Sequence, residues 1–207
     1  MNVEGSIWKG TLEEFRERIL AGDSTTGAVA VAAVSAALAV SVLQMVLEVS
    51  ARKNESVSMR ELIEAARIEA AQLARLADED RAAYTEYAKA LRLPKTSDEE
   101  RAARRSAMDL ALLKATETPL AAARSAVATI KVCAEAAGAV RGAIAADIGG
   151  AAALLAGAVR AMLCSADANL RELPDQPFRR EAAAQRRALE ETAVQQAEAV
   201  LRRVSEQ

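Results

Sequence analysis

The chain has 207 residues, of which 52% are hydrophobic and 27% are charged, and its formal net charge is −2. This composition suits a folded globular protein and excludes a disordered chain, while the mixed charge and the 2% share of aromatic residues argue against a nucleic-acid partner. Because histidine is absent from the sequence, histidine-dependent nucleophiles and ordinary zinc or non-haem iron sites are excluded, and no metal is expected.

Helical spacing runs through nearly every segment, which predicts an all-α fold, a multihelical bundle of long and short helices. Three helix starts carry a capping box, in which a hydroxyl residue is followed three positions later by glutamate: Thr11 with Glu14, Ser58 with Glu61, and Ser97 with Glu100. A further start is indicated by Thr118 before Pro119. Breaks are predicted near Gly22, Asn54, residues 93–96, Gly138 with Gly142, and residues 174–177.

The segment 24–47 carries no charge and is long enough to span a bilayer. Its composition of Ala, Ser, Gly and Val, together with Gln44 and the lack of an aromatic belt or of a strong Lys/Arg asymmetry at its ends, favours a buried central helix and no membrane partner. A core of small side chains buries little area per residue, and such a bundle commonly gains buried surface by association. We therefore expect a homodimer.

The last helix is predicted over about residues 178–206, and its apolar stripe consists of Leu189, Ala193, Ala197, Val200 and Val204. Since the sequence shows no internal repeat and no low-complexity linker, residues 1–207 are expected to form a single domain. Cys133 and Cys164 lie in apolar helical sequence, and we interpret them as buried thiols of a cytoplasmic protein.

Asp80, Tyr84 and Tyr87 lie at positions i, i+4 and i+7 and therefore share one helical face. A carboxylate beside two phenols can bind a cationic group, and it can accept a proton from attacking water if partial burial raises its pKa. A solvated acidic face with tyrosines packed at its edge is the alternative interpretation.

Asp147 is the only charged residue between Arg141 and Arg160. Burial of an unpaired carboxylate is costly, so a functional or structural partner is expected, with Arg141, Arg160 or Lys53 as candidates; an N-cap is a further alternative. Lys53 can hold a ligand carboxylate, or it can interact with the C-terminus of the preceding helix. Asn169 can hydrogen-bond a ligand or cap a helix end.

Three blocks of sequence, taken in order, match the motifs of a known family. Residues 21–30, Ala-Gly-Asp-Ser-Thr-Thr-Gly-Ala-Val-Ala, occupy the place of a Pro-Thr-Pro-Gly-Gly-Gly-Ser motif. Residues 80–101 have the spacing of Asp-x-x-Ala-Phe and Leu-Pro-Lys segments, and residues 115–120 continue the match. Residues 147–169 are similar to a Ser-Asp-x-Gly segment followed by an Asn-rich helix end. In these blocks the chain resembles the formiminotetrahydrofolate cyclodeaminase and methenyltetrahydrofolate cyclohydrolase family.

The resemblance implies a dimeric helical enzyme with a tetrahydrofolate derivative as its small-molecule substrate. Family members either hydrolyse 5,10-methenyltetrahydrofolate or expel ammonia from 5-formiminotetrahydrofolate. Carried over to this sequence, the catalytic pair would be Asp80 and Asp147. The residues predicted to bind the substrate are Gly27, Lys53, Tyr84, Arg141 and Asn169, of which Arg141 stands where the family has paired asparagines.

The departures from the family pattern leave two alternatives open. Where the family has three successive glycines, only Gly27 remains, followed by Ala28 and Val29, which predicts a stiffer and more crowded loop. Residues 140–143 lack the family's paired asparagines, and Ser165 replaces another asparagine. One alternative is an enzyme of the same fold that acts on a different small cationic, cyclic or imine-like substrate. The other is a non-catalytic dimeric helical scaffold.

Overall fold

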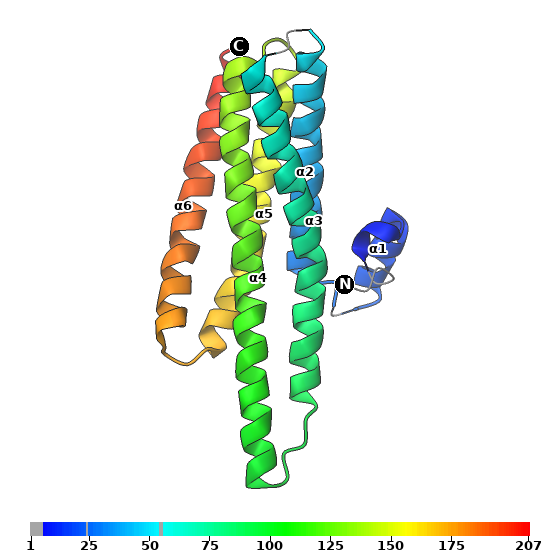
Figure 1. The fold of residues 1–207 in the computed structure, drawn as a ribbon, viewed down its shortest axis with the longest axis vertical. Helices are drawn as coiled ribbons and strands as arrows, with labels where there is room; N and C mark the ends of the chain where they lie inside the picture. The colour runs from blue at the N-terminus through cyan, green and yellow to red at the C-terminus, as the bar shows by residue number, and fades with distance from the viewer. Residues whose placement is uncertain (1–5, 24, 54–55) are drawn as a thin grey trace.

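The computed structural model describes residues 6–23, 25–53 and 56–207, and these residues form a short 3-10 helix and six α-helices (Figure 1). In chain order the elements are η2 (Ile7–Lys9), α1 (Leu12–Leu20), α2 (Ala28–Ala51), α3 (Val57–Leu91), α4 (Asp98–Ala139), α5 (Ala145–Glu172) and α6 (Pro177–Ser205). The all-α prediction is confirmed.

The long helices α2 to α6 run up and down in alternating directions and pack into one bundle (Figure 1). Helix α2 contacts α3 and α5, while α4 contacts α3, α5 and α6. The buried apolar residues form one cluster, whose largest fully buried members include Leu43, Leu73, Leu120, Ile130 and Leu163. Helices α3 and α4 extend beyond the others at the end where residues 92–97 join them (Figure 1).

The N-terminal segment is fastened to the side of α3. Asp78 accepts hydrogen bonds from Ser6 Oγ at 2.7 Å and from the Ile7 amide at 2.8 Å. The Trp8 indole N–H donates to the Ala74 carbonyl oxygen at 2.9 Å. Helix α1 stands beside the bundle (Figure 1) and contributes no fully buried residue. These contacts hold residues 6–8 against α3.

Two predicted capping boxes are confirmed. Thr11 Oγ1 accepts from the Glu14 amide at 3.1 Å, and Glu14 Oε2 accepts from the Thr11 amide at 2.7 Å. Ser97 and Glu100 make the same reciprocal pair at 3.1 and 3.2 Å. These side chains satisfy amide groups that lack an intrahelical partner, so they define where α1 and α4 begin.

Two predicted helix starts are wrong. Ser58 lies inside α3, because Ser56 is the N-cap and its hydroxyl accepts from the Met59 amide at 3.1 Å. Thr118 and Pro119 lie inside α4, which is continuous across them. A proline inside a helix lacks one amide donor and strains the preceding turn, and the packing of α4 against its neighbouring helices outweighs that local preference.

The predicted breaks near Gly22 and Gly142 are confirmed, and both glycines have positive φ values, 75° and 86°. Gly138 instead lies inside α4. A Cβ atom at this position would lie 2.7 Å from the Arg203 guanidinium of α6, the mobile end of a long side chain that would have to shift. The break predicted near Asn54 falls outside the described residues.

Helices α2 and α5 are both long and apolar enough to cross a membrane by length and composition. Within the protomer, 61% of the most apolar window of α2 and 50% of that of α5 are buried, so the predicted full burial of α2 is not found. The uncovered side of α2 carries Val31, Leu38 and Met45 at seven-residue spacing, with exposed fractions of 36%, 48% and 46%. Leu154 of α5, 56% exposed, lies on the adjoining surface. An apolar face therefore remains on this side of the bundle.

The two cysteines differ in their surroundings. Cys133 is buried in α4, and desolvation raises the pKa of its thiol to about 12. Cys164 of α5 is exposed, so its predicted burial is wrong; the outward side of α5 is apolar in sequence without being covered in the protomer. Both thiols are free.

Candidate functional site

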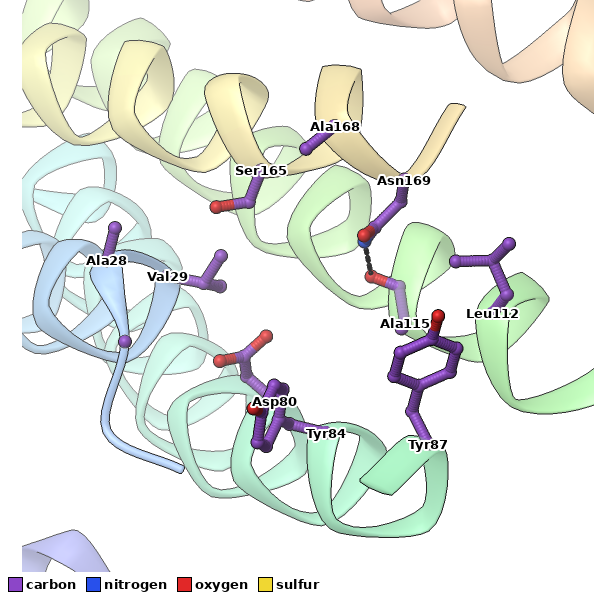
Figure 2. A pocket seen from close by; sticks show the side chains of 11 residues that line it. Ala28, Val29, Asp80, Tyr84, Tyr87, Leu112, Ala115, Ser165, Ala168 and Asn169 are labelled. Carbon is purple, nitrogen blue, oxygen red and sulfur yellow. Dashed lines mark hydrogen bonds between the residues drawn. The ribbon is translucent and has the colours of Figure 1, made fainter. Parts of the chain in front are cut away.

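A pocket of about 270 Å³ lies where the N-terminus of α2 approaches the second half of α3, with α4 and α5 opposite (Figure 2). All four helices contribute to its lining, which consists of Gly27, Ala28, Val29, Asp80, Tyr84, Tyr87, Leu112, Ala115, Ser165, Ala168 and Asn169. A mainly apolar wall with a few polar groups is typical of ligand sites. The volume lies near the lower end of the usual range of roughly 300–1,000 Å³, so it suits a small ring system.

Asp80 points into this pocket from α3 (Figure 2). Desolvation by burial raises the pKa of its carboxyl group from 3.8 to about 6. Among the described residues, none donates a hydrogen bond to the carboxylate or forms an ion pair with it. A carboxylate with a pKa close to neutrality and no protein partner is suited to bind a cationic group and to exchange a proton with a ligand.

Tyr84 and Tyr87 follow Asp80 on the same face of α3, and all three side chains line the pocket as their spacing predicts (Figure 2). Tyr84 is 39% exposed, while Tyr87 is partly buried against the core. Phenol rings can stack on a planar ligand, and their hydroxyl groups can donate or accept a hydrogen bond. This face of α3 therefore borders a pocket, and its role in ligand binding stays a prediction.

The N-terminus of α2 forms the wall of the pocket that faces Asp80 (Figure 2). Gly27 is the N-cap of this helix, and no side chain caps it. The amide groups of the first turn, at Ala28 and Val29, can therefore donate to a carbonyl oxygen or an anionic group of a ligand, at the positive end of the helix dipole.

Gly27→Ala is expected to leave the free energy of unfolding nearly unchanged. The φ of Gly27 is an ordinary −86°, and a Cβ atom there would meet no atom within 4 Å. Gly22→Ala is the matched comparison and is expected to cost about 1 kcal/mol, because φ at Gly22 is 75°. Denaturant unfolding of both variants measures the difference. Equal destabilisation of the two variants would show that the chain at Gly27 is strained.

Asp23 organises the loop that precedes α2. Its carboxylate accepts hydrogen bonds from the Thr25 amide at 3.0 Å, from Thr25 Oγ1 at 2.7 Å and from Thr26 Oγ1 at 3.4 Å. The hydrogen bonds from Thr25 are the main reason why the pKa of the Asp23 carboxyl is lowered, and the nearby charge of Arg81 adds to the effect. A turn built on threonine hydroxyls therefore leads the chain into α2 where the resembled family has a run of glycines.

Ser165 and Asn169 reach the pocket from one face of α5, four residues apart (Figure 2). Asn169 Nδ2 donates to the carbonyl oxygen of Ala115 on α4 at 2.8 Å. The Asn169 side chain thus links two helices across the floor of the pocket, and it does not cap the end of α5. Its neighbour Asp167 is engaged elsewhere, in an ion pair with Arg186 of α6 at 2.9 Å.

Lys53 and Arg141 are not part of this pocket. They lie at the far end of the bundle, beyond the 24 residues of α2, or about 36 Å of helix. Lys53 is exposed after the C-terminus of α2. Arg141 donates to the carbonyl oxygens of Gly138 at 2.8 Å and Val140 at 2.9 Å, so it caps the C-terminus of α4. Neither cation can reach a ligand beside Asp80 within one protomer.

Asp147 is exposed in the first turn of α5, where a carboxylate interacts favourably with the helix dipole. Because Asp147 is not buried, it does not need the ion-pair partner that was predicted for it. None of the described residues forms an ion pair with Asp147. Arg160 pairs instead with Glu190 at 3.7 Å. About 33 Å of helix separates Asp147 from Asn169, so the predicted pair of Asp80 and Asp147 is not formed within the protomer.

Several lining residues were not assigned from the sequence. Leu112, Ala115 and Ala168 are small or apolar, and only the packing of α4 and α5 opposite α3 brings them to the pocket. Ser165 had a usable signal, since it lies one helical turn before Asn169 on the same face. Over the described ranges, no group of three or more Asp, Glu or Cys side chains lies close enough together to hold a metal ion.

The family described as Formiminotransferase-cyclodeaminase matches residues 11–188 of the chain. A search of curated proteins gave no match. Among solved structures, the chain is similar to formiminotetrahydrofolate cyclodeaminase from Thermotoga maritima, with a TM-score of 0.85 and 22% identity over 97% of this chain and 98% of that chain. At this level of identity, the likeness establishes the fold.

Proposed function

The chain belongs to the formiminotransferase-cyclodeaminase family, and from this premise we propose that it is a folate one-carbon enzyme whose reaction takes place beside Asp80. The substrate is either 5-formiminotetrahydrofolate, which is cyclised with loss of ammonia, or 5,10-methenyltetrahydrofolate, which is hydrolysed to the 10-formyl form. The family match over most of the chain and the likeness to the fold of the Thermotoga maritima enzyme support this proposal.

The carboxylate of Asp80 is the observation that carries the proposal. Formimino and methenyl groups both hold positive charge spread over an N–C–N unit, and an unpaired carboxylate in a partly apolar pocket stabilises such a cation. With a pKa of about 6, the group is mostly ionised at neutral pH and is still basic enough to take up a proton during reaction.

In the cyclising reaction, N10 of the substrate adds to the formimino carbon, and Asp80 takes the proton that N10 loses. The protonated carboxyl group then gives this proton to the former imine nitrogen, which leaves as ammonia. A C=N bond forms between the carbon and N5, and the carboxylate is regenerated. One carboxylate is therefore sufficient, and Asp147 has no role in this scheme.

In the hydrolytic reaction, Asp80 accepts a proton from the water that adds to the methenyl carbon. It returns that proton to N5 as the bond between N5 and the carbon breaks. The hydroxyl proton of the intermediate is released to solvent, and the carbon remains on N10 as a formyl group. The same position of Asp80 thus serves either reaction.

The remaining lining groups hold the ring system in place. Tyr84 and Tyr87 offer stacking surfaces, and the free amides at the start of α2 offer donors to a ring carbonyl oxygen. A volume of about 270 Å³ accommodates the bicyclic head, so the aminobenzoyl-glutamate tail would extend out of the protomer's pocket.

A different small cationic, cyclic or imine-like substrate is the second candidate. The small volume and the methyl groups that Ala28 and Val29 add to the lining of the pocket favour it. Such an enzyme would keep the Asp80 chemistry with a smaller ring.

The loss of methenyltetrahydrofolate absorbance on addition of the purified protein tests the proposal, together with the rate of ammonia release from formiminotetrahydrofolate. We expect one of these reactions to be accelerated, and Asp80→Asn to lower kcat by about 100-fold or more. Asp109→Asn, on an exposed position of α4, is the control for loss of one surface carboxylate. Equal inactivation by Asp147→Asn would contradict the single-carboxylate scheme, and absence of binding by any folate would contradict the folate assignment.

We also propose that the protein is a homodimer in which the α2–α5 face is covered. A groove of about 680 Å³ runs along this face, and its lining contains no charged side chain: Ile19, Thr26, Gly27, Ala28, Val31, Ala32, Ser35, Ala153, Leu154, Gly157, Ala158 and Ala161. Continuous apolar surface of this kind marks an association site in soluble proteins. Gly27 and Ala28 line both the groove and the pocket, so a second subunit would border the site of reaction.

A further inference from the structure

Pro119 leaves one carbonyl group of α4 without its helical donor. In an α-helix, each amide N–H donates to the carbonyl oxygen four residues earlier, and proline has no N–H. The carbonyl group that loses its partner is that of Ala115, which belongs to the lining of the pocket. The helix continues past this point, so the carbonyl oxygen is available to a donor from outside α4.

Asn169 of α5 supplies that donor. Its Nδ2 atom lies 2.8 Å from the Ala115 carbonyl oxygen (Figure 2). A carbonyl oxygen can only accept, so this contact determines which end of the amide faces α4. The other end, Oδ1, accepts no hydrogen bond within the part of the chain that the structure describes. Asn169 is therefore held with its acceptor free beside the pocket.

We propose that Pro119 and Asn169 together determine ligand specificity: the carbonyl group released by Pro119 orients the Asn169 amide so that Oδ1 presents an acceptor to the ligand. Asp80 offers a second acceptor from α3, on the opposite side of the same pocket (Figure 2). A pocket with two acceptors selects a ring that carries N–H donors on its edge. This inference rests on the function proposed above. It adds that Asn169 recognises the edge of the ligand ring that carries N–H donors.

Two variants and their combination first test whether Asn169 replaces the helical donor that Pro119 lacks. Pro119→Ala returns an N–H to α4, and this N–H competes for the Ala115 carbonyl and releases the Asn169 amide. Asn169→Ala leaves that carbonyl without a donor in the wild-type background but not in the Pro119→Ala background. We therefore expect Asn169→Ala to lower Tm in the first background and to have little effect on Tm in the second.

Steady-state kinetics measure KM, which a purely structural link between α4 and α5 would not change. Pro119→Ala and Asn169→Ala are each expected to raise KM for the folate substrate by about fivefold to tenfold, with kcat nearly unchanged, and the double variant is expected to resemble Asn169→Ala. Pro177→Ala is the control for removal of a proline, because Pro177 starts α6, where a missing N–H has no helical partner. An unchanged KM in Pro119→Ala would overturn the proposal.

NMR of the Asn169 side-chain NH₂ group requires no ligand and distinguishes this inference from the proposed function. We expect the NH₂ proton that faces Ala115 to exchange slowly in the wild type and faster in Pro119→Ala. If this change occurs and no folate binds, the proposed function fails while the orientation of Asn169 stands. If the NH₂ signals do not respond to Pro119→Ala, the inference fails whatever the substrate is.

Discussion

Asp80→Asn is expected to raise the free energy of unfolding at pH 8 by about 2 kcal/mol, although the same change removes activity. The folded state raises the pKa of this carboxyl from 3.8 to about 6, which means that folding disfavours its ionised form. A shift of this size corresponds to at most about 3 kcal/mol, and contact of the side chain with solvent reduces it. Asparagine has nearly the same shape and no charge, so it removes this cost.

The pH dependence of the free energy of unfolding follows from the direction in which the pKa of Asp80 is shifted. Between pH 3.8 and about 6, the folded protein binds more protons at Asp80 than the unfolded chain does, so the contribution of Asp80 to stability falls as pH rises through this window. Activity has the opposite trend, because the carboxylate is the active form and kcat/KM should rise through pH 6. Denaturant unfolding of wild type and Asp80→Asn at pH 4 and pH 8 measures the difference.

The stability gain of Asp80→Asn should be present at pH 8 and nearly absent at pH 4. Asp109→Asn, which removes an exposed carboxylate, should show no such pH-dependent difference. A variant that is less stable than wild type at pH 8 would show that an interaction of the carboxylate outweighs its desolvation. A residue that lowers stability is maintained where it is needed for function, so a confirmed gain would support Asp80 as the reacting group.

Leu38→Glu is expected to convert a dimeric protein into a monomer. Leu38 is 48% exposed at the centre of the uncovered stripe of α2, between Val31 and Met45. In a two-fold symmetric interface each substitution occurs twice, so two apolar contacts are lost and two carboxylates are placed in an apolar contact. A loss of at least about 3 kcal/mol corresponds to a weakening of dimerisation by roughly 100-fold or more.

Sedimentation equilibrium over a range of protein concentrations measures this effect. Leu110→Glu is the matched control, because Leu110 is an exposed leucine of α4 and therefore lies outside the proposed interface of α2 and α5. A wild-type protein that remains monomeric at high concentration, or a Leu38→Glu variant that remains dimeric, would contradict the proposed interface. Flotation of the wild type with lipid vesicles would indicate instead that a membrane covers this face.

Local spacing predicted the parts of the site that belong to one helix. Asp80, Tyr84 and Tyr87 share a face of α3 because helical geometry alone places positions i, i+4 and i+7 together. The caps at Thr11 and Ser97 were predictable for the same reason, since their partners lie three residues away.

Tertiary packing overruled local signals elsewhere. Pro119 is a strong local indication of a helix start, but it lies inside α4, where packing and the hydrogen bond from Asn169 offset the missing donor. Segment 24–47 reads as apolar on every side, but only part of α2 is covered in the protomer. The spacing of apolar residues predicts which faces of a helix are apolar, but it does not predict which helix or subunit covers them.

The all-α class, most helix boundaries and the carboxylate-bearing face of α3 were determined by the sequence itself, because each depends on residues a few positions apart. Which residues line the pocket together was decided by the tertiary structure. Gly27, Asp80 and Asn169 come from helices far apart in the chain and meet because the bundle packs α2, α3 and α5 together. Asp147 lies on the same helix as Asn169 but at its other end, and a rigid α-helix holds the two apart.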